Sequence, residues 1–311
     1  MATKPQHSSG PAAALQVAQQ ASTILAKSAS VSAKFPNSLF SRPETPELWT
    51  ELEQLLYACL RTGDDKSAFL CLEKLTQRFG ADNDRVMALR GLYQEAVAEN
   101  EEALHGILQD YNQILLENPM NVHIHKRRIA LIKAMGRRQQ AIANLVDFLD
   151  SFPTDVEAWS ELSELYYTEG LITQSIFSLE EAVIITPNAW NLHARLGELH
   201  YMASLSSSDS VEVQKQLTQA IQRFSRSIEL CDDYLRGFYG LKLASDKLLQ
   251  TSSSTKGGST ASISVEKVQK LNQLATSKLE TMVKQRAANR SPGIDQSGVV
   301  AAQELLNRSK G

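Results

Sequence analysis

The sequence is poor in cysteine and has no long apolar run. Its 311 residues include three cysteines, Cys59, Cys71 and Cys231. So few scattered cysteines cannot form a disulfide framework or a zinc site, and we expect buried, reduced thiols in a cytosolic protein. No segment approaches the roughly 18 apolar residues that a membrane span requires. Any attachment to a membrane is therefore expected to depend on partners.

The residue patterns of an active site are also missing. There is no nucleophile motif, phosphate-binding loop or metal-ligand cluster. His123 and His125 stand two positions apart, and on a helix this spacing places the rings on different faces, which argues against a metal site. Carboxylate pairs such as Glu161 and Glu164 recur along solvated helix faces. We therefore predict that the protein is not an enzyme and has no catalytic residue, metal or cofactor.

Acidic residues are unevenly distributed along the chain. Residues 1–43 carry four bases and no acid, and residues 251–311 carry nine bases and four acids. The body between them, residues 44–250, carries 19 bases and 31 acids, a net charge of −12. Nucleic-acid binding requires a basic surface, so this acidic body argues against a nucleic-acid partner.

The acid-free segment 1–43 is rich in Ser, Ala and Gln. Transit peptides share this composition, but Arg42 is the only arginine and no long apolar core is present, so a secretory signal is disfavoured and a mitochondrial signal is the weaker alternative. Leu15, Ala18, Ser22 and Leu25 share one helical face. We interpret the segment as carrying a short docking helix.

Proline recurs at a fixed interval in the centre of the chain. Pro119, Pro153 and Pro187 are 34 residues apart, and each closes a stretch that reads as two amphipathic helices. A 34-residue helix–turn–helix period is typical of the tetratricopeptide repeat. We predict an all-α fold, a right-handed superhelical solenoid of about five helix–turn–helix units with N- and C-terminal capping helices. Such a fold serves as a binding scaffold.

The stretch from Val156 to Thr186 matches the repeat best, with Gly170 at its turn. Small residues allow the two helices to approach, aromatic rings fill the wedge between them, and proline stops the second helix. The predicted structural repeat positions are Ala68, Tyr111, Pro119, Ala141, Pro153, Trp159, Leu162, Tyr166, Leu179, Pro187, Ala220 and Phe224.

Away from the centre the repeats are degenerate. Gly80 takes the place of a proline and is followed by about five extra linker residues, 80–84, and the polar stretch 204–214 is predicted to be a surface insertion. The predicted domains are the N-terminal segment 1–43, a repeat domain 44–250, a flexible loop 251–262, a capping helix 263–290 and a mostly disordered tail 291–311.

One cluster of bases stands out from the acidic body. Six of the 19 bases of residues 44–250 fall within 13 residues, and no acid occurs from 118 to 146. This basic stretch consists of Lys126, Arg127, Arg128, Lys133, Arg137 and Arg138. It is either an exposed helix face followed by a basic turn, or a dock for an acidic partner segment or lipid head groups. Lys126 and Lys133 share a face with Ala130, which in a tetratricopeptide superhelix lines the concave groove.

A familiar ligand of such grooves is the C-terminal tail of a chaperone, held by lysines, asparagines and an arginine. Lys126 and Arg195 fit the first lysine and the arginine of this clamp. Ala130 and Glu161 stand where the two asparagines belong, so the sequence disfavours the clamp. A free cytosolic adapter that binds chaperones or peptide tails is kept as the alternative function, and Arg195 stays among the candidate partner-binding residues.

Four stretches of the chain carry a resemblance to one family. They are 68–79 (AFLCLEKLTQRF), 111–119 (YNQILLENP), 126–142 (KRRIALIKAMGRRQQAI) and 157–179 (EAWSELSELYYTEGLITQSIFSL). They resemble the subunit 2 family of the endoplasmic reticulum membrane protein complex, and the likeness runs from about Leu48 to Leu243. The basic stretch is part of the match.

This resemblance implies a soluble tetratricopeptide subunit, peripheral on the cytosolic face of the endoplasmic reticulum membrane. It implies a scaffold role in a complex that inserts tail-anchored and multi-spanning proteins without consuming energy. The implied partners are membrane-spanning subunits, whose cytosolic segments would lie in the groove, and a second soluble subunit on another surface.

Overall fold

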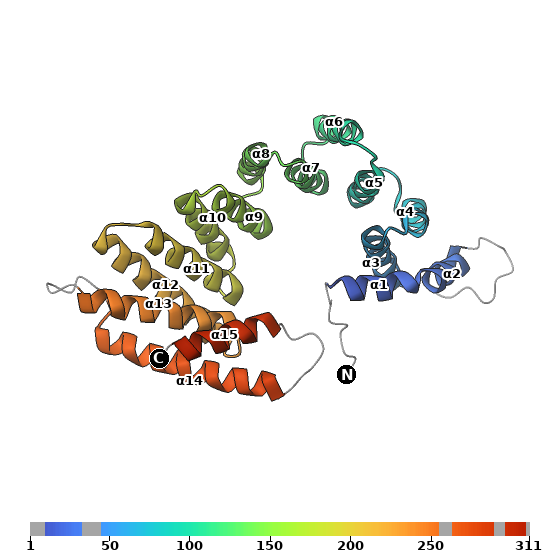
Figure 1. The fold of residues 1–311 in the computed structure, drawn as a ribbon. Coiled ribbons are helices and arrows are strands. Elements are labelled where there is room, and N and C mark those ends of the chain that lie inside the picture. Colours follow the sequence, from blue (N-terminus) through green and yellow to red (C-terminus); the bar gives the residue numbers. More distant parts are fainter. Residues whose placement is uncertain (1–9, 33–44, 255–262, 289–295, 309–311) are drawn as a thin grey trace. The chain divides into compact units, whose positions relative to one another are not determined.

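A computed structural model describes residues 10–32, 45–254, 263–288 and 296–308, and every regular element in these ranges is a helix (Figure 1). The chain divides into two compact units, residues 1–141 and 142–311, which are considered separately below. The helices are α1 Pro11–Gln19, α2 Ala21–Ser32, α3 Pro46–Thr62, α4 Asp65–Phe79, α5 Asp84–Val97, α6 Glu101–Glu117, α7 Val122–Ala134, α8 Arg138–Ser151, α9 Val156–Thr168, α10 Ile172–Ile185, α11 Trp190–Ser206, α12 Ser210–Leu230, α13 Leu235–Ser254, α14 Val265–Ala288 and α15 Gln296–Arg308. In the described ranges, none of them combines the length and apolar character needed to cross a membrane.

Helices α3 to α14 follow one another as six helix–turn–helix units, one more than the sequence suggests. The turn glycines Gly63, Gly136 and Gly170 each have φ between 75° and 77°, a conformation that side chains with a Cβ rarely adopt. Asn121 and Asp155 begin the first helices α7 and α9, where their side chains accept hydrogen bonds from backbone N–H groups three residues later. The turn predicted at Gly170 is thus present, and Gly63 and Gly136 form equivalent turns in two other units.

Each of the three prolines of the 34-residue interval makes the same kind of hydrogen bond. Each lies in the linker after a second helix, and its carbonyl accepts from a ring N–H six residues further along. The pairs are Pro119 with His125 (2.9 Å), Pro153 with Trp159 (2.8 Å) and Pro187 with His193 (2.9 Å). The proline interval therefore marks a capping contact as well as a helix stop, and it explains ring side chains at these positions.

In the N-terminal unit, the predicted docking helix is two helices, α1 and α2, that pack against α3. A turn at Gln20 separates them and changes which face is buried: Ala14, Ala21 and Ile24 are buried, whereas Leu15 is 51% exposed. Of the predicted docking face, Ala18 and Leu25 pack on the core of α3 and α4 whereas Leu15 does not, and the docking is made by two helices instead of one. Residues 1–9 and 33–44 of the predicted segment lie outside the described residues.

The core of the N-terminal unit joins α3 and α4. It is built from leucines of both helices together with Cys59, Ala68 and Cys71, each fully buried. Cys59 and Cys71 thus match the expectation of buried free thiols, while Cys231 in the other unit is only half-buried. The short side chain of Ala68 allows α4 to approach α3, as the repeat pattern predicts.

In the C-terminal unit, the predicted insertion 204–214 is mostly helical. Helix α11 extends to Ser206 and α12 begins at Ser210, so only 207–209 connect them. Ser204 is buried, and Val213 packs on the core beside Leu217. The insertion therefore lengthens both helices instead of forming a loop, because its polar sequence carries an amphipathic face, and residues 208–211 are exposed as expected of a surface insertion.

The end of the chain is also more ordered than its sequence suggests. Helix α14 lies within the predicted capping helix 263–290, and the predicted loop is helical as far as Ser254, with 255–262 outside the described residues. Within the predicted disordered tail, residues 296–308 form α15, whose Ala302 and Leu306 are buried in the core shared with α13 and α14. Apolar residues at helical spacing, Val299 included, explain this correction.

Candidate binding surfaces

Arg127 of the basic stretch is engaged inside the N-terminal unit. Its guanidinium donates to the Glu95 carboxylate, which also accepts the Tyr111 hydroxyl at 2.5 Å, so the three side chains join α7, α5 and α6. Burial, followed by the charge of Glu95, raises the pKa of Tyr111. Burial acts to lower the pKa of Arg127, but the hydrogen bond and charge of Glu95 outweigh it and raise that pKa. Arg127 therefore stabilises the unit.

Two more arginines of the stretch contact α6. Arg128 donates to the Asn112 side chain at 3.1 Å, and Arg137 lies against the His105 ring. Lys133 and Arg138 are exposed. The structural interpretation of the basic stretch thus accounts for Arg127, Arg128 and Arg137, while Lys126, Lys133 and Arg138 stay candidates for partner contact.

Lys126 lines a surface cavity of about 340 Å³ on the first helices α3, α5 and α7. Arg85, His123 and Arg127 line it as well, with Glu53 as its acidic residue. Glu53 is paired with Arg85 at 2.7 Å. Such a cavity, rich in nitrogen donors, suits a carboxylate from a partner segment.

Sequence reasoning missed the contribution of Arg85 and His123 to this surface. A second cavity of about 390 Å³ shares both side chains and continues toward Trp49 and Phe79. Arg85 lies 41 positions before Lys126, and no local pattern in the sequence links the two. Only the packing of α5 against α7 brings them together.

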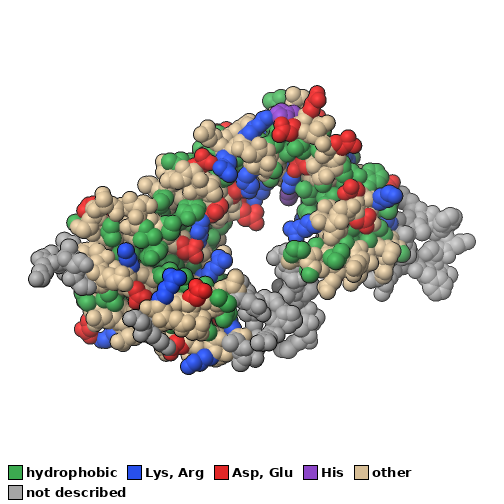
Figure 2. Space-filling view, in the orientation of Figure 1, with side chains coloured by type: hydrophobic (Ala, Val, Ile, Leu, Met, Phe, Trp, Pro, Cys, Tyr) green, Lys and Arg blue, Asp and Glu red, His purple; other side chains and the backbone are tan. Residues whose placement is uncertain are grey.

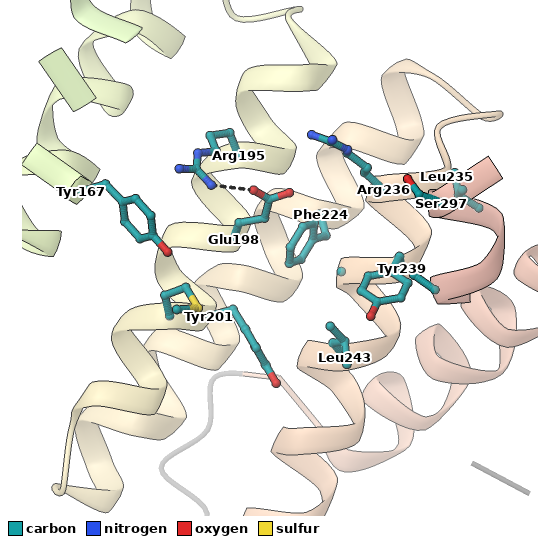
Figure 3. A pocket seen from close by; sticks show the side chains of 14 residues that line it. Tyr167, Arg195, Glu198, Tyr201, Phe224, Leu235, Arg236, Tyr239, Leu243 and Ser297 are labelled. Carbon is teal, nitrogen blue, oxygen red and sulfur yellow. Dashed lines mark hydrogen bonds and ion pairs between the residues drawn. The ribbon is translucent and has the colours of Figure 1, made fainter. Parts of the chain in front are cut away.

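A cavity of about 620 Å³ lies in the C-terminal unit (Figure 3). The first helices α9, α11 and α13 line it, and α15 adds Ser297, Gly298 and Ala301. Phe224 of α12 reaches its floor between Gly197 and Gly240, whose missing side chains leave space for the ring. Most of the lining is apolar or aromatic, which is typical of a site for a ligand or partner segment.

Arg195, the proposed clamp arginine, lies at the edge of this cavity. Its guanidinium pairs with Glu164 at 2.8 Å and with Glu198 at 2.9 Å, and it stacks 4.9 Å from the centre of the Tyr167 ring (Figure 3). Burial acts to lower its pKa, but hydrogen bonds and the two carboxylates raise it. The charge of Arg195 is thus already compensated within the unit. Across the cavity lie Arg236 and Tyr239 of α13.

Charges of both signs lie close together on the visible face of each unit (Figure 2). This agrees with the internal pairing of Arg85, Arg127 and Arg195. In the part of the chain that the structure describes, no group of three His, Cys, Asp or Glu side chains is placed to hold a metal ion.

Comparison with known proteins identifies the family. Residues 63–215 match the family described as the EMC2 TPR-like repeat domain. The TPR repeat protein oca3 of Schizosaccharomyces pombe is 32% identical over 206 residues, which cover 66% of this chain and 69% of that protein. The chain belongs to the EMC2 family of TPR-like repeat proteins. The all-α tetratricopeptide solenoid predicted from the sequence is confirmed.

Other EMC2 relatives match over a similar length. The ER membrane protein complex subunit 2-A of Xenopus laevis is 33% identical over 199 residues, 64% of this chain and 63% of the frog protein, so the match spans less than two thirds of that relative. Among solved structures, the C-terminal part of a TPR repeat-containing protein from Cytophaga hutchinsonii aligns at 12% identity with a TM-score of 0.49, covering 90% of this chain and 98% of that one.

Proposed function

We propose that this EMC2-family chain is a non-catalytic scaffold subunit of the endoplasmic reticulum membrane protein complex. In this role it lies on the cytosolic face of the membrane, peripherally attached, and organises that side of the complex for energy-independent insertion of tail-anchored and multi-spanning proteins. The observation that carries the proposal is the 33% identity to a relative named as subunit 2 of that complex. A solenoid whose first helices line two cavities supports a scaffold role.

The partners in this proposal are the membrane-spanning subunits and a second soluble subunit. In this proposal, acidic residues of cytosolic segments of the former would face Lys126, Arg85 and His123 in the N-terminal cavity. Lys133 and Arg138, exposed on α7 and α8, extend the cationic surface beside it. Arg127 and Arg137 act as positioning residues, because their contacts with Glu95 and His105 join α7 and the following turn to α5 and α6.

Membrane fractionation tests the location. A tagged full-length chain expressed in its own cell type should pellet with endoplasmic reticulum membranes and should be released by alkaline carbonate, as peripheral proteins are. A chain that stays in the soluble fraction would overturn the proposal and favour the free adapter. Binding of the chain to vesicles of anionic phospholipid is a separate experiment. Binding that is lost in Lys133→Glu would show that lipid head groups also contact the basic stretch.

A further inference from the structure

The C-terminal cavity presents hydrogen-bond donors that no described residue uses. The hydroxyls of Tyr167, Tyr201 and Tyr239 line it and make no hydrogen bond within the described ranges. Arg236 is exposed at the rim and forms no ion pair with a described residue. The carboxylate of Glu198, by contrast, is engaged by Arg195. The tyrosine hydroxyls can therefore donate or accept a hydrogen bond from a ligand, and Arg236 adds a cation that has no ion-pair partner among the described residues.

The remainder of the lining is suited to apolar side chains. Phe224, Leu235 and Leu243 line the cavity (Figure 3). Met202 lines it as well. Burial raises the pKa of Tyr201, and the neighbouring Tyr239 adds to the shift. With about 620 Å³, the cavity is larger than one side chain and admits two or three adjacent residues of a segment.

We propose that this cavity binds a partner segment in which an aliphatic or aromatic residue stands next to Asp or Glu. The apolar side chain packs on Phe224 and Leu243, the carboxylate pairs with Arg236, and backbone carbonyls accept from the tyrosine hydroxyls. A basic segment fits badly because it would meet Arg236 while the nearest carboxylate is already paired. This inference rests on the proposed function, because it takes the first helices of the solenoid as the surface that binds partner segments.

Selection from a random displayed-peptide library on the purified full-length chain tests this chemistry. The enriched sequences should place a large apolar residue within two positions of Asp or Glu. Enrichment of Lys- or Arg-rich sequences, or no enrichment above a chain with Met202→Glu, would overturn the proposal. Met202 is 37% exposed in the cavity wall, so this variant changes the cavity without removing a buried side chain.

Affinity measurements with a selected peptide provide the residue-level test. Arg236→Glu should weaken binding by about tenfold or more, equivalent to the loss of one charge pair. A peptide with Lys in place of its acid should bind Arg236→Glu better than the wild type. The matched control is Arg226→Glu, since Arg226 is exposed on α12 beside Glu229 and does not line the cavity. Equal affinity of wild type and Arg236→Glu would contradict the assignment.

The outcomes also separate this inference from the proposed function. If the chain stays soluble in cells but selects acidic, apolar peptides through Arg236, the complex membership fails and the cavity assignment stands. If the chain pellets with membranes but selects no such peptide, the cavity assignment alone fails.

Discussion

Gly240 lies directly against the ring of Phe224. A Cβ atom added at Gly240 would lie 2.2 Å from Cε1 and Cζ of that ring, and one added at Gly197 would lie 3.0 Å from it. The ring can therefore pass from α12 to the first-helix surface only because two neighbouring helices lack side chains at the crossing. Gly240 and Phe224 both line the cavity of about 620 Å³ in the C-terminal unit.

Gly240→Ala is expected to destabilise the chain, because a methyl group there forces Phe224 out of its position. Overpacking of this kind costs about 1–3 kcal/mol. The change is measured as a lower midpoint of urea unfolding of the full-length chain, followed by circular dichroism. Gly106→Ala on α6 is the matched control, since a Cβ there meets nothing within 4 Å. We expect the control to gain about 0.5–1 kcal/mol from helix propensity. A Gly240→Ala chain as stable as the control would contradict the packing.

Glu95→Gln should destabilise the N-terminal unit. The substitution leaves the partly buried guanidinium of Arg127 without its counter-charge and weakens the hydrogen bond from Tyr111. Because the side chains of Arg127 and Glu95 both keep some solvent contact, we expect the free energy of unfolding to fall by about 1–3 kcal/mol, which is less than for a fully buried pair. Urea unfolding measures it. Asp110→Asn on the exposed face of α6 should leave the free energy of unfolding almost unchanged. Equal losses of stability in the two variants would show that the pair of Arg127 with Glu95 does not stabilise the unit.

Substitutions of Trp159 test the hydrogen bond between a ring N–H and the carbonyl of a proline of the 34-residue interval. Its ring is half-buried, packs edge-on against Phe177 and donates to the Pro153 carbonyl. Trp159→Phe keeps most of the ring and loses the hydrogen bond, which should cost about 1 kcal/mol. Trp159→Ala also loses the packing and should cost about 2–4 kcal/mol, toward the lower end of aromatic truncations. Similar unfolding midpoints for the two variants would show that the ring packing contributes little.

The buried thiols predict a loss of stability at alkaline pH. Burial, then the charge of Asp64, raises the pKa of Cys59 to about 11, and burial, then Cys59, raises that of Cys71 to about 12. Below about pH 9 both thiols are protonated in the folded and unfolded chain, so their full contribution is present. Above that pH the unfolded chain ionises first, and the contribution is lost as pH rises toward about 12.

Urea midpoints measured across this alkaline range test the effect. The wild type should lose stability more steeply than the Cys59→Ala, Cys71→Ala double variant, whatever the difference between them at neutral pH. Parallel pH profiles would mean that these thiols ionise as easily in the folded chain as in the unfolded one.

Lys126→Glu combined with Lys133→Glu should weaken partner binding and leave helicity unchanged. Neither lysine is buried, and Lys126 lines the cationic cavity, so reversing both charges repels an acidic segment without disturbing the core. Co-purification of partners with the full-length chain measures this. The control reverses two exposed lysines elsewhere, Lys66 of α4 and Lys278 of α14, with the same change in net charge. Equal partner recovery from both variants would return the basic stretch to a purely structural role.

The regular centre of the fold can be read from the sequence because local signals agree there. Gly136 and Gly170 end first helices, and Pro153 follows a second helix, each at the position that the 34-residue period predicts. The ends of the chain are different. Helix α15 carries apolar residues at helical spacing, but only its packing on α13 and α14 shows that this face is buried.

The site was only partly predictable for the same reason. A run of bases such as the basic stretch is visible in the sequence, but the partners that engage Arg127 and Arg137 lie 32 residues away. Arg236 has no neighbouring base to mark it. Its place at the cavity rim follows from the packing of α13, and Phe224 reaches the floor through a gap that two separate glycines create.

Affinity purification of the full-length chain from its own cells in mild detergent, with mass spectrometry of the associated proteins, tests the scaffold role most directly. The account predicts recovery of a defined set of integral membrane proteins, in near-constant ratio to the chain, together with a second soluble protein, and reduced recovery in the Lys126→Glu, Lys133→Glu variant. Recovery of the chain alone, or of chaperones without any integral membrane protein, would contradict it.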